Sequence, residues 1–244
     1  MVGSYYFQFN VTRKPFDDVR VRKAFAMAFN SRDLVDKVTK GGQLATNSIV
    51  PPMAGYTPAT GNPYNVEQAK KLLAEAGFPG GAGFPKVTLL YNTSDAHKKI
   101  MEWAQESWKK NLGVEVALMN QEWATYLDTK QVSHDFDFAR AAWVGDYLDP
   151  NTFLDMFLSD SGLNDGLYKN AKYDELVRKA ATMPAGKARM DTLRQAEDIF
   201  ITQEQGVAPV YHYVEQDLID LTKWDGWYAN PLGAHNWKFV APKK

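Results

Sequence analysis

The sequence contains no cysteine, no long apolar run and no excess of charge of either sign. Without cysteine it has no disulfide bonds, thiolate nucleophiles, cysteine-ligated zinc or iron–sulfur clusters. It lacks any stretch of ~18 consecutive apolar residues, so it predicts no membrane-spanning helix. The 28 Lys and Arg residues balance 29 Asp and Glu residues, which excludes a general attraction to nucleic acid or to an anionic membrane. A ligand must therefore be recognised by a local site.

The start of the chain also lacks a recognisable leader. Met1–Phe7 carries neither the basic start nor the apolar stretch of a secretory signal. An exported protein whose leader has been removed, or a segment cut from a longer protein, would have the same start. The missing signal therefore does not indicate a cytosolic address.

What is present is a chain of 244 residues with 45% apolar side chains, enough for a substantial core. Apolar periodicity predicts two helices between Asp18 and Gly41, the second capped by Ser31. A loop rich in proline and glycine follows, over Gly41–Pro63. Asn65 then predicts the N-cap of a helix over 66–76, which ends at Gly77 in a left-handed conformation.

The middle of the chain alternates between strand and helix patterns. The expected elements are a strand at Lys86–Tyr91, a helix at Asp95–Leu112, a strand at Val114–Met119, a helix at Glu122–Lys130 and a strand at Phe136–Ala141. Connections of this length favour parallel strands, so we expect an α/β fold with a mainly parallel sheet flanked by helices. Ligands of such sheets lie beyond the carboxyl ends of the strands, here Tyr91–Asp95, Asn120–Trp123 and Ala142–Asp149. Downstream, we expect helices at Pro150–Phe157, Ala171–Thr182 and Gly186–Gln203 and a strand at Val207–Val214.

Signatures of catalysis and of cofactor binding are missing. The sequence has neither a G-x-S-x-G elbow nor a P-loop, and the glycine run Gly80–Gly83 precedes a strand instead of opening a helix. The histidines are too scattered for a metal site: His97, His134, His212 and His235. We therefore expect no enzyme activity, no metal and no cofactor.

Two carboxylates follow the third expected strand. Asp149 precedes Pro150, which suits a first helical position, so Asp149 is expected to cap a helix. Asp146 follows Gly145 between aromatic residues and has no such task. A single carboxylate there can neutralise the ammonium group of a ligand. An ordinary surface aspartate is the alternative.

Two of the seven tryptophans, Trp123 and Trp143, lie in the expected ligand region. They either wall a binding pocket or pack over the edge of the sheet. Together with Asp146 and a second acid, they also leave open a carbohydrate-active enzyme.

Several segments, taken in chain order, resemble the peptide-binding components of ABC importers. Three segments resemble the second lobe of these components: Tyr5–Phe7, Pro15–Ala24 and Ala69–Gly77. Four more resemble the oligopeptide-binding (OppA-type) members of solute-binding protein family 5: Tyr91–Lys99, Asn120–Trp123, Arg140–Pro150 and Pro209–Tyr213. The resemblance implies one α/β lobe, residues 1–244, of a two-lobed periplasmic-binding-protein fold (type II, cluster C). In the family, the segment matching residues 225–244 returns to the first lobe.

The resemblance also implies roles for individual residues. Asp146 would pair with the α-ammonium of a peptide, and the backbone of Ala142, Trp143, Val144 and Gly145 would pair with its main chain as an added strand. Such pairing tolerates many peptide sequences. Trp123 and Trp143 would wall roomy side-chain pockets.

Three residues match family positions that meet the peptide carboxylate, namely Arg140, Lys130 and His97. Lys130 stands where the family has arginine, and the following loop 131–135 is one residue longer than in the family. Val144 replaces a cysteine. Arg140 has a second, structural interpretation, in which it bonds to Asp137 or to loop carbonyls.

Family members are about twice as long as this chain and enclose the peptide between two lobes. The implied partners are short peptides, a first lobe and a membrane permease, with no nucleic acid. The implied location is the periplasm, or the outside of the cell with the protein tethered by a lipid anchor. An isolated lobe is expected to bind peptide weakly. A receptor for dipeptides, nickel, haem or sugars stays open, as does an interaction domain that binds no small ligand.

Overall fold

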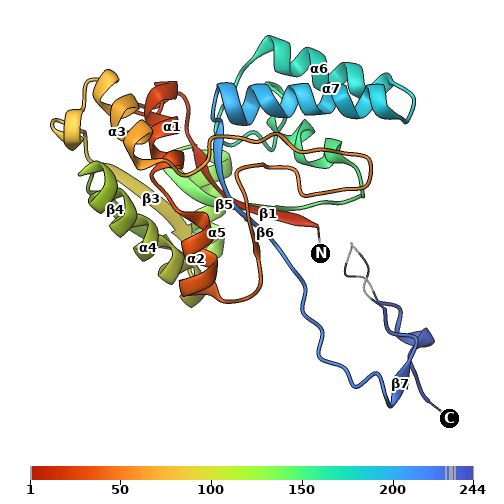
Figure 1. Cartoon of the computed structure of the whole chain (residues 1–244). Helices are drawn as coiled ribbons and strands as arrows, with labels where there is room; N and C mark the ends of the chain where they lie inside the picture. The colour runs from red at the N-terminus through yellow and green to blue at the C-terminus, as the bar shows by residue number, and fades with distance from the viewer. Residues whose placement is uncertain (1, 229, 231–232, 234, 244) are drawn as a thin grey trace.

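The computed structural model describes residues 2–228, 230, 233 and 235–243, and a mixed six-stranded sheet forms its centre (Figure 1). In spatial order its strands are β2 (Leu44–Ala45), β6 (Val207–His212), β1 (Gly3–Phe9), β5 (Phe138–Val144), β3 (Val87–Asn92) and β4 (Val116–Gln121). The three strands of the expected βαβαβ unit, β3, β4 and β5, pair in parallel. The other pairings are antiparallel, so the sheet is mixed.

Helices cover both faces of this sheet. They are α1 (Val19–Met27), α2 (Ser31–Leu34), α3 (Val66–Glu75), α4 (Asp95–Leu112), α5 (Trp123–Leu127), α6 (Ala171–Thr182) and α7 (Lys187–Glu197). Wider π-helical turns prolong α2, α5 and α7 at Val35–Thr39, Asp128–Val132 and Asp198–Gln203, and short 3-10 turns lie at Pro79–Gly81, Pro150–Phe153, Asp155–Phe157 and Trp237–Phe239. The hairpin of α6 and α7 lies apart from α1, α3 and α4 (Figure 1).

The helix expected over Pro150–Phe157 is instead two short 3-10 turns. The caps predicted for α2 and α3 hold with one correction. The side chain of Asn65 accepts the amide of Gln68, and Gly77 has φ of +98° at the end of α3. The cap of α2 is Asn30, whose side chain accepts the amide of Asp33, and not Ser31, which is the first helical residue. Asn and Ser cap helices about equally well, so the pattern alone could not choose between neighbours.

The strand β5 begins and ends later than its pattern predicted. It runs over Phe138–Val144 instead of 136–141. Its last residues pair with β1, with Ala142 opposite Tyr5 and Val144 opposite Gly3. The segment expected to follow the strand is therefore partly the strand itself.

Two apolar clusters hold the helices on the sheet. One contains Trp108 of α4, whose indole nitrogen donates to the carbonyl of Phe25 at 2.9 Å and whose ring lies 5.4 Å from that of Phe138. The other packs α6 against the π-helical turn after α7, through Tyr173 and Phe200. Burial of such rings supplies most of the favourable free energy of folding.

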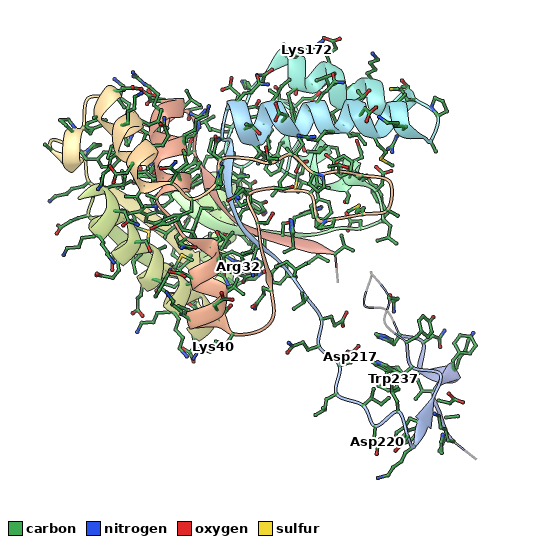
Figure 2. The ribbon with its side chains drawn as sticks, in the orientation of Figure 1. Arg32, Lys40, Lys172, Asp217, Asp220 and Trp237 are labelled. Carbon is green, nitrogen blue, oxygen red and sulfur yellow. The ribbon has the colours of Figure 1, made fainter. Side chains whose placement is uncertain are left out.

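The last part of the chain extends away from the sheet (Figure 1). It contains the short strands β7 (Trp224–Asp225) and β8 (Ala241–Pro242), which pair with each other. Trp237, labelled in Figure 2, is 71% exposed. Residues 229, 231–232, 234 and 244 of the expected segment 225–244 lie outside the described residues, as does residue 1.

Across residues 2–228, 230, 233 and 235–243, no helix combines the length and the apolar character that crossing a bilayer requires.

The buried His212 makes the stability of this fold depend on pH. Its Nδ1 lies 2.9 Å from Oγ of Ser4, and burial lowers its pKa from 6.5 to about 4. Between these two pKa values His212 binds a proton in the unfolded chain but not in the folded chain, so the stability of the fold falls as the pH drops below 6.5. We expect the free energy of unfolding to fall by about 2 kcal/mol from this residue between pH 6.5 and 4.5.

Urea titrations at several pH values measure this slope. His212→Gln should make it shallower but not flat, because burial lowers the pKa of His97 to about 4 as well. His235→Gln, in the C-terminal segment, should leave it unchanged. An unchanged slope in His212→Gln would show that other groups cause the acid sensitivity.

Candidate functional site

The carboxyl-terminal half of β5 has an open side. The amide of Gly145 donates to the carbonyl of Val2 and that of Asn10 to Asp137, so odd-numbered residues of β5 bond to β1. In an antiparallel pair the residues between them direct their N–H and C=O groups the other way, here toward β3. β3, however, pairs with β5 only as far as the partner of Ala139. Ala142 and Val144 thus present main-chain groups to a side on which no described strand pairs with them.

Asp146 lies just beyond this open stretch and is exposed. Its amide donates to Oγ1 of Thr152 at 3.3 Å. Its carboxylate has no hydrogen bond or ion pair with any residue that the structure describes. The side chain is therefore available to a cationic ligand.

The expected role of Asp149 is confirmed. Its carboxylate accepts the amide of Asn151 at 2.9 Å, which caps the turn that begins at Pro150. Both of its oxygens also bind the guanidinium of Arg189 on α7, at 2.6 and 2.9 Å. Both carboxylate oxygens of Asp149 are thus bound by protein groups, whereas no described residue binds the carboxylate of Asp146.

The two tryptophans of the expected site lie on the same face of the sheet. Trp143 packs against the cluster beneath α6 and α7, and its indole nitrogen lies 3.4 Å from Oγ1 of Thr152. Trp123 is 55% exposed and stacks on Tyr126, with ring centroids 5.6 Å apart. Trp123 presents ring surface to solvent, and Trp143 is partly used in packing.

Arg140 points to the opposite face, among phenol rings. Its guanidinium lies over the ring of Tyr5 at 4.8 Å and approaches Tyr213 at 3.4 Å and Asn92 at 3.3 Å. The alternative bond to Asp137 is not formed, and that carboxylate accepts the amide of Thr88. Arg140 forms no ion pair with any described carboxylate, and its buried Nε has no partner. A partly buried cation without a counterion is suited to an anionic ligand.

His97 lies beside this guanidinium, with its Nδ1 3.3 Å from the hydroxyl of Tyr5. Burial, together with the charge of Arg140, lowers the pKa of His97 to about 4. His97 is therefore neutral at pH 7 without ligand, and acts there as a hydrogen-bonding group and not as a cation.

Lys130 does not join these groups. It is 6% exposed, and its ammonium binds the carboxylate of Asp165, which is also buried. Burial lowers the pKa of Lys130, and Asp165 opposes that shift. In this structure the ammonium of Lys130 is therefore already paired with a carboxylate.

Sequence reasoning missed the residues that hold the site together. Thr152 contacts both Asp146 and Trp143. Tyr126 donates from its hydroxyl to the carbonyl of Arg140. The tyrosines in the strand patterns are the only signal in the sequence that could have indicated polar aromatic side chains at the site. Nothing in the sequence indicates which residues these side chains contact.

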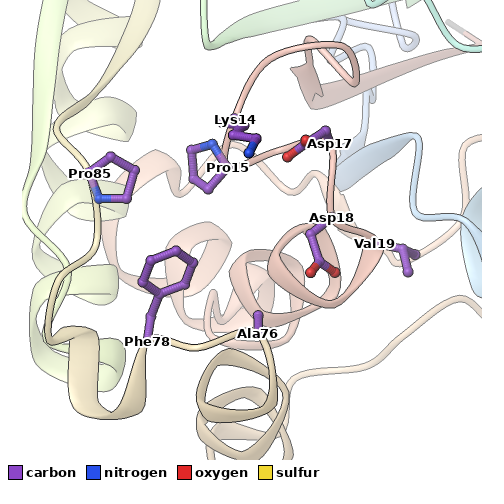
Figure 3. Close-up of a pocket in the computed structure, with 8 residues that line it drawn as sticks. All are labelled: Lys14, Pro15, Asp17, Asp18, Val19, Ala76, Phe78 and Pro85. Carbon is purple, nitrogen blue, oxygen red and sulfur yellow. The ribbon is translucent and has the colours of Figure 1, made fainter.

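A separate surface hollow of about 780 Å³ lies near the start of α1 and the end of α3 (Figure 3). The side chains of Phe78, Pro15 and Pro85 lie around it, with Lys14 and Asp18. None of the expected site residues lines it.

Comparison with known proteins identifies the relatives of this chain. The sequence profile of the "Bacterial extracellular solute-binding proteins, family 5 Middle" matches residues 2–165. The periplasmic oligopeptide-binding protein OppA of Salmonella typhimurium is 39% identical over 93% of this chain and 42% of its own length. The periplasmic murein peptide-binding protein MppA of Escherichia coli is 40% identical over 89% of this chain and 41% of its own length.

Solved structures agree. A periplasmic oligopeptide-binding protein of an ABC transporter from Borrelia burgdorferi (OppAIV) superposes with a TM-score of 0.88 at 34% identity, over 100% of this chain and 49% of that one. The chain spans about two fifths of the length of the curated relatives it matches. The relatives are periplasmic or extracellular solute-binding proteins, a class that is not enzymatic. This chain belongs to family 5 of the bacterial extracellular solute-binding proteins and has the fold of one lobe of an OppA-type protein.

Proposed function

We propose that this chain is the peptide-binding lobe of the solute receptor of an ABC oligopeptide importer. The observation that carries the proposal is an unpaired carboxylate, Asp146, directly beyond a stretch of β5 whose main chain is open. The carboxylate would hold the α-ammonium of the peptide. Ala142 and Val144 would pair with its main chain, which all peptides share.

The other end of the peptide would meet Arg140 and His97. Arg140 is a cation that no carboxylate neutralises within the described ranges, and the neutral His97 can donate a hydrogen bond. The names of the relatives, which refer to oligopeptides and murein peptides, support this class of ligand. Lys130 is not part of the proposed site, because Asp165 occupies it.

The proposal extends to partners and location. Residues 1–244 would form one lobe, and the segment 225–244 would contact a first lobe that closes over the peptide. The assembled receptor would deliver peptides to a membrane permease, either free in the periplasm or tethered outside the cell by a lipid anchor. Without the first lobe, one wall of contacts and the exclusion of water are both missing.

Calorimetry with trilysine tests the proposal on this chain. We expect a dissociation constant above about 1 µM. N-acetylated trilysine should bind at least about tenfold more weakly than the free amine, because acetylation removes the charge that Asp146 binds. Asp146→Asn should abolish that difference.

Asp36→Asn provides the matched control, since Asp36 is an exposed aspartate on another part of the surface. It should leave the preference for the free amine intact. Equal binding of the two peptides by the unaltered chain would contradict the role of Asp146. Submicromolar binding would contradict the need for a second lobe.

A further inference from the structure

We propose that Arg189 of α7 is a positioning residue for peptide binding, acting through Asp149 to fix the segment that carries Asp146. This inference rests on the proposed function. Arg189 lies 40 residues from Asp149 in the sequence, and it has no contact with the proposed ligand groups.

Arg189 uses its whole guanidinium. Its two terminal nitrogens donate to the two oxygens of Asp149 at 2.6 and 2.9 Å, and Nε donates to the carbonyl of Ala180 at the end of α6 at 3.0 Å. The side chains of Arg189 and Asp149 are only 14% and 23% exposed. A two-pronged arginine–carboxylate pair fixes both distance and direction, which a lysine cannot do.

Asp149 passes this constraint to the site through one short turn. Its carboxylate caps the turn Pro150–Phe153, which contains Thr152. Oγ1 of Thr152 accepts the amide of Asp146 and lies 3.4 Å from the indole nitrogen of Trp143. The hairpin of α6 and α7 therefore holds the backbone on which the free carboxylate stands.

The packing beneath Gly145 makes the position of this turn critical. A Cβ built on Gly145 would lie 3.1 Å from side-chain atoms of both Thr152 and Phe153. The turn Pro150–Phe153 therefore packs directly against the backbone of Gly145. A shift of the turn would move Asp146 with it. A binding group that is held in place before the ligand arrives loses less entropy on binding.

The carboxylate of Asp155 accepts hydrogen bonds from two neighbouring side chains of the loop. Tyr147 donates to Asp155 at 3.2 Å, and Asn151 donates to the same carboxylate at 2.9 Å. The carboxylate of Asp146 takes no part in these hydrogen bonds. Asp149 and Asp155 thus bind partners within the described residues, while Asp146 is exposed to solvent.

Two variants test the inference. Arg189→Met removes both prongs at similar length, and Arg189→Lys keeps the charge but loses the fork. Lys187→Met is the matched control, because Lys187 is a basic residue of the same helix that pairs only with Asp191, four residues on, in solvent. Amide hydrogen exchange by NMR reports the order of the loop without any ligand.

In Arg189→Met we expect the amides of Asp146 and Asn151 to exchange at least about tenfold faster, while the amide of Tyr6 in β1 stays as slow as before. The preference for free over N-acetylated trilysine should fall toward one. Arg189→Lys should show a smaller change of the same kind, and Lys187→Met none.

The outcomes separate this inference from the proposed function. Unchanged exchange and an unchanged preference in Arg189→Met would overturn the positioning role and leave the role of Asp146 intact. Faster exchange across the whole sheet would also overturn it, since Arg189 would then support the fold in general. If the unaltered chain shows no preference for the free amine, the proposed function fails, and with it any role of Arg189 in binding.

Discussion

Replacing Glu197 with alanine should lower the free energy of unfolding by about 4 kcal/mol. The carboxylate is completely buried at the end of α7 and accepts four hydrogen bonds. The donors are the hydroxyls of Ser48 and Tyr56 at 2.6 and 2.7 Å and the amides of Val50 and Ala59 at 2.9 and 2.7 Å. Alanine would leave the hydroxyl of Tyr56 and the amides of Val50 and Ala59 buried without this acceptor, while the hydroxyl of Ser48 could still donate to the carbonyl of Val50.

Urea unfolding measures this loss. Glu197→Gln should cost less, about 2–3 kcal/mol, because one carbonyl oxygen remains while the new amide faces two donors. Glu175→Ala, an exposed residue of α6 paired with Lys172, should change stability by less than about 1 kcal/mol. A loss below that value for Glu197→Ala would show that the loop 46–59 is not held by this carboxylate in solution.

Lys130→Met should destabilise the fold by about 3–5 kcal/mol. The substitution leaves the carboxylate of Asp165 buried, with its only cation removed among the described residues. The peptide should bind to Lys130→Met as it does to the unaltered chain, since Lys130 lies outside the proposed site.

The double variant Lys130→Met/Asp165→Leu distinguishes the effect of an unpaired buried charge from the effect of a changed side-chain shape. It should recover much of the stability lost in Lys130→Met, because two apolar side chains replace a charge that has no partner. Urea unfolding of both variants gives the comparison. A double variant that is as unstable as Lys130→Met would show that shape, and not the unpaired charge, causes the loss.

The fold could be predicted where the signal is local. The helix over Val66–Glu75 follows from Asn65 and Gly77, and the three parallel strands follow from apolar alternation separated by helical patterns. β1 could not be found in this way, because all seven of its residues are buried and none marks an outer face. Its place in the sheet depends on pairing with β5, more than a hundred residues away.

In the site, too, the roles that depend on sequence neighbours could be predicted and those that depend on distant residues could not. The role of Asp149 followed from its neighbour Pro150, and Asp146 was left unassigned by the same argument. The partners that decide the rest are distant in sequence: Asp165 occupies Lys130, and Arg189 occupies Asp149. Pairings of this kind depend on how helices fold back on the sheet, and no spacing in the sequence encodes them.

The point at which β3 parts from β5 limits the length of any chain that could pair there. The open stretch lies between two strands of the sheet, and Leu90 closes it at one end by pairing with Ala139. At a rise of about 3.3 Å per residue, the distance from Arg140 to Val144 is roughly 13 Å. A guest strand longer than about five residues must therefore bend out of the sheet at the closed end, whatever its side chains are.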